Sequence, residues 1–234
     1  MSLPVVRNRL VLAGAVLYLL EWVAIIAAGV NVPLGAHASA HDVTAAYAGH
    51  ADAIGWAAGW FCVVELGRIL VMVGLRAALP DTRRLRPLLD VAVIAMAVSV
   101  ALEIVVYAVA AGGAWSLDHG GSSGVVRVLD AVSYQLNQTI YGPLGAALLC
   151  AGWAMWRSGA FHRALAALAL TAGALTTLLA LAFVAPRFSD VAQGLEASAL
   201  LMWIWMVWTG VVVWRARPLA DHTSSDVPSD RVSV

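Results

Sequence analysis

The chain has 234 residues, of which 62% are hydrophobic and only 12% are charged, and its formal net charge is +0. So few charged side chains cannot cover the surface of a soluble domain of this length, which excludes an ordinary water-soluble protein. All 14 basic residues are arginine. All four glutamates lie within apolar stretches, whereas most aspartates lie between those stretches or in the C-terminal tail. We therefore predict an integral membrane protein with carboxyl groups inside the bilayer.

Six apolar stretches are long enough to cross a bilayer as helices, which takes roughly 20 apolar residues. They cover about residues 10–30, 53–75, 88–111, 128–156, 164–185 and 194–214. The predicted fold class is all-α, a polytopic transmembrane helical bundle of six spans in a single domain, residues 1–217. Residues 218–234 are polar and rich in serine and aspartate, so we expect a disordered cytoplasmic tail.

Arginine is distributed unequally between the two sides of the predicted bundle. Two arginines, Arg127 and Arg187, fall on one side and ten fall on the other. Because positive residues are retained in cytoplasmic segments, we predict that both termini are cytoplasmic, in an inner (cytoplasmic) membrane. The ten are Arg7, Arg9, Arg76, Arg83, Arg84, Arg86, Arg157, Arg163, Arg215 and Arg217. This bias accounts for the arginine content, so nucleic acid is not an expected partner.

The first span has a competing interpretation as a cleaved signal peptide. Its apolar core of about 21 residues exceeds the roughly 7–15 of a signal sequence, and Glu21 interrupts it. We therefore predict a retained anchor. Within it, Tyr18, Glu21, Trp22 and Ile25 share one helical face.

The second span contains the most informative pair of residues. Glu65 and Arg68 are three positions apart in an apolar helix, a spacing that puts them on one face where they can pair. A charge at this depth costs about 3 kcal/mol on insertion scales, so such residues are usually buried in a bundle and often functional. Near the outer end, Gly55 and Gly59 form a GxxxG pattern that lets another helix approach closely. A homodimer contact through these glycines is an open alternative.

Two further spans carry polar residues at helical spacing. In the third, Ser99, Glu103 and Tyr107 recur every four residues and form one stripe. In the fourth, Pro143 is expected to kink the helix beside a polar segment. That segment contains Tyr134, Gln138 and Tyr141, which share a face, and the adjacent Asn137.

The predicted outer loops offer two weaker signals. Residues 31–52 contain His37 and His41 at an i, i+4 spacing and also His50, which could bind a metal ion together with nearby aspartates. No spacing here matches a tight metal signature, so we favour a polar loop with a short surface helix. Residues 112–124 form a glycine-rich outer loop without lysine or a preceding strand, which argues against phosphate binding there. We expect neither a resident metal ion nor a cofactor.

Helix geometry brings the polar residues of several spans to similar depths. Glu21 and Glu65 lie near the predicted midplane, Arg68 slightly below it, and Glu103 at the midplane or in the outer half. These four are the candidate catalytic residues of one buried polar pocket, and unconnected hydrogen bonds between helices are the alternative. One arginine cannot neutralise four glutamates, so at least one glutamate is expected to be protonated. The other candidate lining residues are Trp22, Trp56, Trp60, Tyr107, Tyr134, Asn137, Gln138, Tyr141, Glu196 and Trp203.

Three segments carry a resemblance to a known family: RLVLAGAVLYLLEW near the start, RSGAFHRALAALALTAGAL in the middle and WxxWxGVVVWRARP near the end. They resemble a large bacterial family of small six-span integral membrane proteins known only as a domain of unknown function. The similarity covers almost all of residues 7–217 and implies a fold without an activity. The chain has a looser likeness to integral membrane terpene cyclases, which are similar in size and use intramembrane carboxylates. No motif aligns to those enzymes residue by residue.

Three functional classes remain after these observations. The first is a membrane-embedded enzyme acting on a lipid-like, isoprenoid-type substrate, in which a protonated glutamate is the general acid and aromatic rings stabilise a carbocation. Proton-initiated terpene cyclisation fits it best. The second is a small proton-coupled transporter, and the third is a non-catalytic accessory or sensor protein. The expected partners are membrane lipid and a lipid-like small molecule.

Overall fold

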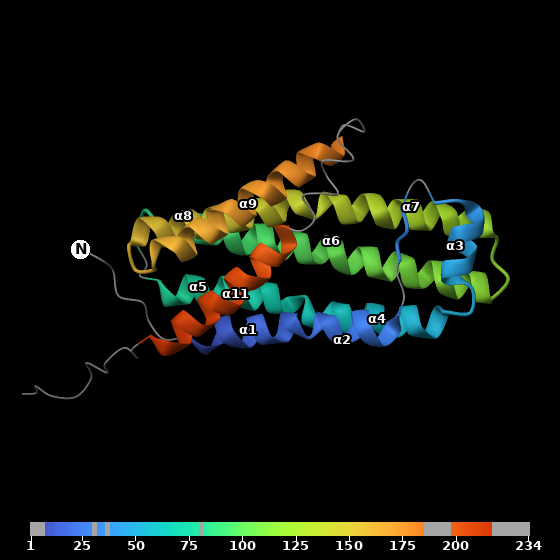
Figure 1. Ribbon diagram of the computed structural model, residues 1–234, viewed down its shortest axis with the longest axis horizontal. Coiled ribbons are helices and arrows are strands. Elements are labelled where there is room, and N and C mark those ends of the chain that lie inside the picture. Colours follow the sequence, from blue (N-terminus) through green and yellow to red (C-terminus); the bar gives the residue numbers. More distant parts are fainter. Residues whose placement is uncertain (1–7, 30–31, 36–37, 80–81, 185–197, 217–234) are drawn as a thin grey trace, which may run out of the picture.

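The computed structural model describes residues 8–29, 32–35, 38–79, 82–184 and 198–216. Within these ranges every regular element is an α-helix, which confirms the all-α class. The helices are α1 (Arg9–Leu19), α2 (Glu21–Ala28), α3 (Ala40–Tyr47), α4 (Ala51–Val64), α5 (Leu66–Ala78), α6 (Arg86–Asp118), α7 (Ser123–Thr139), α8 (Tyr141–Ser158), α9 (Arg163–Val184) and α11 (Ser198–Arg215). Most of them run along one axis of an elongated bundle, with α3 across one end (Figure 1). The predicted tail, 218–234, lies outside the described residues.

Four stretches of helix are long and apolar enough to cross a membrane: Arg9–Ala28, Ala51–Ala78, Arg86–Asp118 and Arg163–Phe183. They correspond to the first, second, third and fifth predicted spans. The shorter apolar helix Ala199–Arg215 corresponds to the sixth, whose first residues lie outside the described part of the chain. The fourth corresponds to α7 and α8, which follow one another beside α6 (Figure 1). Several apolar helices of this length indicate a multi-pass membrane protein.

The third long helix extends further than its sequence indicates. The glycine content of residues 112–124 predicts a loop, but α6 continues through both of its first glycines to Asp118, so this prediction was wrong for most of the segment. The reason is packing: Ala114 is buried in an apolar cluster that also contains Tyr47 of α3. Such packing outweighs the low helix propensity of two glycines. The helix ends where Gly120 adopts a φ of 87°.

A buried carboxylate holds the helix at the end of the bundle in place. α3, the short helix expected in the first loop, begins with a capping box at Ser39. The hydroxyl of Tyr47 donates to Asp130 of α7 over 2.8 Å. The amides of Leu34 and Gly35 donate to the same carboxylate over 2.9 and 3.1 Å. Burial and the contact with Asp130 raise the pKa of Tyr47, so its hydroxyl remains a donor.

Two pairs of helices approach so closely that only glycine fits at the contact. Where α1 crosses α5, a Cβ on Gly14 would lie 2.8 Å from the backbone nitrogen of Val71, and Gly67 on α5 faces Gly14 in the same way. Where α8 packs on α9, a Cβ on Gly152 would lie 2.9 Å from the backbone nitrogen of Leu170. Inside a membrane there is no hydrophobic driving force between helices, so their association depends on close packing. Small residues allow the two backbones to come into contact.

The glycines of the GxxxG pattern are not among these contacts. Nothing within the described chain lies within 4 Å of a Cβ placed on Gly55 or Gly59. The close helix approach predicted there is therefore not made by the part of the chain that the structure describes. A contact with a second copy of the chain stays a prediction.

Three of the long helical stretches are interrupted by a single turn. The interruptions fall at Leu20 between α1 and α2, at Glu65 between α4 and α5, and at Ile140 between α7 and α8. The last lies three residues before Pro143, from which the sequence predicts a kink. A proline has no N–H to donate to the carbonyl four residues earlier, which belongs to Thr139, the last residue of α7. The other two have no proline nearby, and both lie at the candidate site.

Candidate functional site

Four charged side chains meet in the interior of the bundle, and we call them the glutamate–arginine cluster. Glu21 begins α2, Glu65 lies between α4 and α5, Arg68 is in the first turn of α5, and Glu103 lies within α6. Carboxylate oxygens of the three glutamates lie within 4.8 Å of one another. Glu65 and Arg68 are 0% and 2% exposed, and the other two are also buried. The structure therefore brings together all four predicted catalytic residues.

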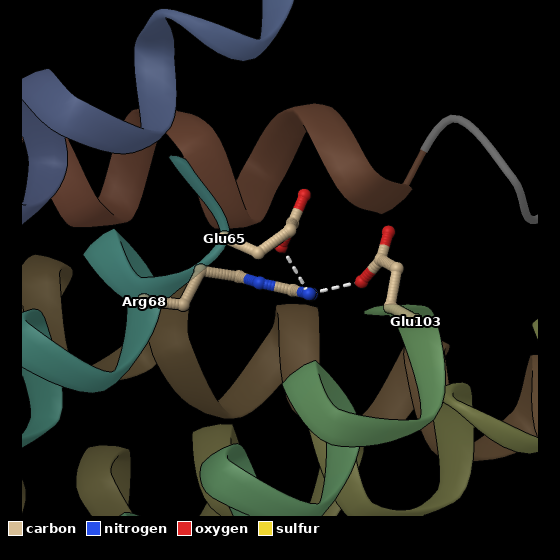
Figure 2. Close-up of polar contacts among 3 residues, drawn as sticks. All are labelled: Glu65, Arg68 and Glu103. Atoms are coloured by element: carbon tan, nitrogen blue, oxygen red, sulfur yellow. Dashed lines mark hydrogen bonds and ion pairs between the residues drawn. The ribbon is translucent and has the colours of Figure 1, made fainter. Parts of the chain in front are cut away.

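Arg68 is the centre of this cluster, as Figure 2 shows. Its Nη2 forms ion pairs with Oε2 of Glu65 and with Oε2 of Glu103. The first pair joins residues i and i+3 of the same helical stretch, as the spacing predicts. The second connects α5 to α6 and could not be read from spacing, because the two residues are 35 positions apart. One guanidinium thus bridges two carboxylates from different spans.

Two helix interruptions place the first two glutamates at the cluster. At Leu20, amide donors reach back only three residues: Leu20 to Leu17 and Val23 to Leu20, each over 3.1 Å. At the second interruption the amide of Arg68 donates to the carbonyl of Glu65 over 3.1 Å, again across three residues. Such tight turns inside long helices often mark functional positions. Here each turn is occupied or followed by a buried glutamate.

An indole links the two interrupted stretches. Nε1 of Trp60 on α4 donates to the carbonyl of Leu20 over 2.7 Å. The ring of Trp60 also stacks on that of Trp56, with centroids 5.9 Å apart, and Trp56 is 46% exposed. Both residues were candidate pocket walls. Trp60 instead supports the turn before Glu21, and Trp56 lies on the outside of the bundle.

Aromatic rings form one wall of the cluster. The guanidinium of Arg68 lies over the ring of Tyr18, 5.2 Å from its centroid. Tyr18 in turn contacts Trp203 of α11, with ring centroids 4.5 Å apart, and Trp203 contacts Trp22 at 5.4 Å. Contacts between a cation and an aromatic face, and between tilted rings, are both favourable. Trp203 and Trp22, two of the predicted lining residues, therefore connect to the cluster through Tyr18.

A groove on the surface of the bundle reaches this wall. It has a volume of about 500 Å³ and is lined by Leu19 of α1 and by apolar residues of α11, including Trp203 and Trp208. Leu19 and Trp208 are substantially exposed, and in a membrane these side chains contact lipid. The groove, Trp203 and Tyr18 thus form a continuous series of contacts from the lipid-facing surface to Arg68.

The cluster carries more potential negative than positive charge. Three carboxyl groups face one guanidinium, and a net charge of −2 in a low-dielectric interior is strongly unfavourable. Within the described chain, no arginine pairs with Glu21, and its Oε2 has no hydrogen-bond partner. Oε1 of Glu65 is unpartnered in the same sense. Charge balance therefore requires a proton on at least one carboxyl, and Glu21 is the one without a cation.

Three converging carboxylates also raise the question of a metal ion, because hard cations prefer oxygen ligands. Arg68 already contacts two of the three through one nitrogen, so its guanidinium takes the position that a cation would need. The arrangement fits an ion-pair cluster better than a metal centre.

The histidines of the first loop do not form a comparable group. His41 and His50 are exposed, and among the described residues neither belongs to a set of three converging metal-ligating side chains. The nearby Asp42 carboxylate accepts a hydrogen bond from the hydroxyl of Ser39. His37 lies outside the described residues.

The remaining predicted lining residues are divided among several places. Tyr107 is beside the cluster, one turn from Glu103, and its ring stacks on Phe61 with centroids 4.1 Å apart. Phe61 was missed, although its position four residues before Glu65 puts it on the same helical face. Tyr141 stacks on Phe183 of α9, with ring centroids 6.3 Å apart.

Three residues of the fourth span are not placed at the cluster by any contact described here. The ring of Tyr134 lies against the outer loop, 3.1 Å from where a Cβ on Gly35 would be. Asn137 is half-buried. Gln138 is buried, and its Oε1 has no hydrogen-bond partner within the described part of the chain. Glu196 lies outside the described residues.

The chain matches no protein-family model, no curated protein and no solved structure.

Replacing Arg68 with methionine should strongly destabilise the protein. It leaves the carboxylates of Glu65 and Glu103 without their cation, and breaking a buried ion pair from one side typically costs about 3–5 kcal/mol. The triple variant Glu65→Gln/Arg68→Met/Glu103→Gln should regain most of that loss, because it leaves no buried charge unpaired. Thermal unfolding in detergent measures both effects.

The matched control is Arg76→Met in the same helix. Arg76 pairs with Asp90 over 2.5 Å, but both side chains are about 40% exposed, so the loss should be about 1 kcal/mol or less. Equal destabilisation by the two single substitutions, or a triple variant no more stable than Arg68→Met, would contradict the role of Arg68 as the shared counter-ion.

Proposed function

We propose that the protein is a membrane-embedded enzyme that transfers a proton to an apolar, isoprenoid-type substrate and so starts its isomerisation or cyclisation. The observation that supports this most is the series of aromatic contacts from an apolar surface groove through Trp203 and Tyr18 to a buried cluster with three carboxyl groups and one guanidinium. A lipid-like molecule can enter such a groove directly from the bilayer. Its reactive carbon then meets an acid in a site from which bulk water is excluded.

The proposed step needs no co-reactant. The O–H bond of one carboxylic acid breaks, and a C–H bond forms at a carbon of a substrate double bond, leaving a carbocation at the other carbon. After rearrangement or ring closure, a neighbouring C–H bond breaks, its electrons form a new double bond, and the proton returns to a carboxylate. The substrate is neither oxidised nor reduced, and the faces of Tyr18 and Trp203 are suited to stabilise the cation.

The ion pairs suggest which carboxyl groups accept a proton and which one donates it. Glu65 and Glu103 contact Arg68, whose positive charge favours their carboxylate form, the form that accepts a proton. Glu21 has no cation among the described residues and is the best candidate for the general acid. Arg68 positions the two bases.

A proton-coupled carrier is the second candidate. The specific observation in its favour is that two spans are interrupted at the cluster, since discontinuous helices are typical of transporter binding sites. A carrier moves its substrate without changing it, so analysis of products separates the two functions.

The proposal includes a topology of six spans with both termini cytoplasmic, α3 on the outer side, in the inner membrane of a bacterium. It rests on the arginine distribution, and it is compatible with the likeness to the small six-span family. A homodimer through the open face around Gly55 and Gly59 remains part of the proposal.

This orientation predicts a simple labelling pattern. After replacement of the two half-buried free cysteines, Cys62 and Cys150, a cysteine at the exposed Ser122 should react with an impermeant maleimide in intact cells. A cysteine at Thr82 should react only after the membrane is permeabilised. Reaction at Thr82 in intact cells would reverse the orientation.

Proton transfer to carbon predicts incorporation of deuterium. Purified protein in lipid nanodiscs is incubated in D₂O with a panel of acyclic polyprenyl alcohols and diphosphates, and the extracted lipids are analysed by mass spectrometry. The wild type should produce an isomer or ring that carries carbon-bound deuterium, and Glu21→Gln should lower the rate by at least about 100-fold, the lower range for loss of a general acid.

The matched control is Asp90→Asn, which removes a carboxyl from α6 far from the cluster along the helix. It should leave deuterium incorporation unchanged. No incorporation with any member of the panel would refute the enzyme, and movement of unchanged substrate coupled to proton flux in proteoliposomes would favour the carrier. Full activity of a folded Glu21→Gln protein would transfer the acid role to Glu65 or Glu103.

A further inference from the structure

A second polar site lies at the end of the bundle opposite α3, where the turn between α5 and α6 meets the end of α8 (Figure 1). A pocket of about 300 Å³ is lined there by Thr82, Arg84, Leu85 and Arg157. Two guanidinium groups and one hydroxyl therefore share one concavity, and none of the described residues that line it is acidic. The glutamate–arginine cluster has no residue in common with it.

The two arginines of this pocket differ from their neighbours in having no carboxylate partner within the described chain. The described acidic side chain of this region, Asp90, is already engaged: Arg76 contacts it over 2.5 Å and Arg86 over 3.8 Å. Arg84 is exposed and forms no ion pair among the described residues, and Arg157 lies over the ring of Trp153, 5.8 Å from its centroid. Among the described residues, the pocket therefore concentrates positive charge without a paired carboxylate.

The backbone adds to this positive character. The amides of Leu85 and Arg86 both donate to the carbonyl of Thr82, over 3.1 and 3.0 Å, and form the turn from which α6 starts. α6 begins at Arg86 without a side-chain cap, so the positive end of its helix dipole lies at the pocket. Thr82 Oγ1 accepts from the Leu85 amide over 3.3 Å, which leaves its hydroxyl hydrogen available to a ligand.

Tryptophan places the pocket at the depth of lipid headgroups. Trp153 and Trp156 of α8 are each 44% exposed, and Arg157 and Arg163 lie over their rings at 5.8 Å. Tryptophan is enriched where hydrocarbon meets the headgroup region. The stacked Trp153 also restricts Arg157, so less side-chain freedom is lost when a ligand binds.

We propose that this pocket binds a phosphate group, supplied by the headgroup of an anionic membrane lipid. A guanidinium can donate two parallel hydrogen bonds to phosphate oxygens, and a second guanidinium and the Thr82 hydroxyl can engage the remaining ones. The site is independent of the proposed catalysis, because Arg84 and Arg157 are distant in the fold from Arg68. Free inorganic phosphate has the same chemistry, and its binding is tested separately.

Binding of short-chain lipids to the purified full chain in detergent tests this site. Dihexanoyl phosphatidic acid is titrated by calorimetry. Dihexanoyl phosphatidylcholine serves as the comparison lipid, because its phosphate is esterified with a positively charged choline. Phosphatidic acid should bind and phosphatidylcholine should bind at least about tenfold more weakly. Arg84→Gln and Arg157→Gln should each weaken phosphatidic acid binding about tenfold, the loss expected for one charge-assisted contact.

The matched control is Arg83→Gln, which removes the same charge from the exposed neighbour of Arg84 that does not line the pocket. It should change the affinity less than about twofold. All three residues are at the surface, so the variants should fold, and their thermal unfolding checks this.

Two results would overturn the proposal: no binding of phosphatidic acid or inorganic phosphate, or equal losses for Arg83→Gln and Arg84→Gln, which would show diffuse attraction to a basic loop. Inorganic phosphate that competes at equal concentration with the lipid, with the same sensitivity to Arg84 and Arg157, would support the phosphate site and assign it to a soluble ligand.

Discussion

The structure depends on one buried cation shared by two carboxylates. Arg68 joins α5 to α6 through Glu103 and is held within its own stretch by Glu65. Because an uncompensated charge in the bilayer interior costs several kcal/mol, these helices are held in the register that keeps the ions together. Glycine contacts between α1 and α5 then bring Glu21 to the same place, since Gly14 and Gly67 allow the two backbones to touch. The cluster and the close packing are therefore parts of one arrangement.

This arrangement explains why the interrupted helices lie where they do. A tight turn at Leu20 precedes Glu21, another includes Glu65, and Trp60 donates to the first turn from the helix that contains the second. An irregular backbone is tolerated inside a membrane only where protein covers it. The turn at Glu65 is buried in the cluster, and at the more exposed Leu20 the indole of Trp60 donates to the backbone carbonyl. The groove beside Trp203 lies against the aromatic rings that form the wall of the site.

Hydropathy and helical spacing were sufficient to predict the all-α class, the long apolar helices and the Glu65–Arg68 pair, because these features depend on local sequence. They also placed Glu21 and Glu103 at a common depth. The ion pair with Glu103 and the turn at Leu20 could not be predicted, since both depend on which helices become neighbours. The loop predicted at residues 112–124 failed for a related reason: burial of Ala114 against α3 decided the conformation of a glycine-rich segment. Spacing alone likewise could not separate Tyr107, beside the cluster, from Tyr141, which stacks on α9.

The central claim is that the cluster holds a proton on Glu21, the carboxyl without an ion pair among the described residues, and infrared spectroscopy observes such a group directly. A protonated carboxylic acid has a C=O stretch that is separate from the carboxylate bands and shifts in D₂O. The account predicts this band at neutral pH in wild-type protein and in Asp90→Asn, and its loss in a folded Glu21→Gln protein. A wild-type spectrum without the band, or a band unchanged by Glu21→Gln, would contradict it.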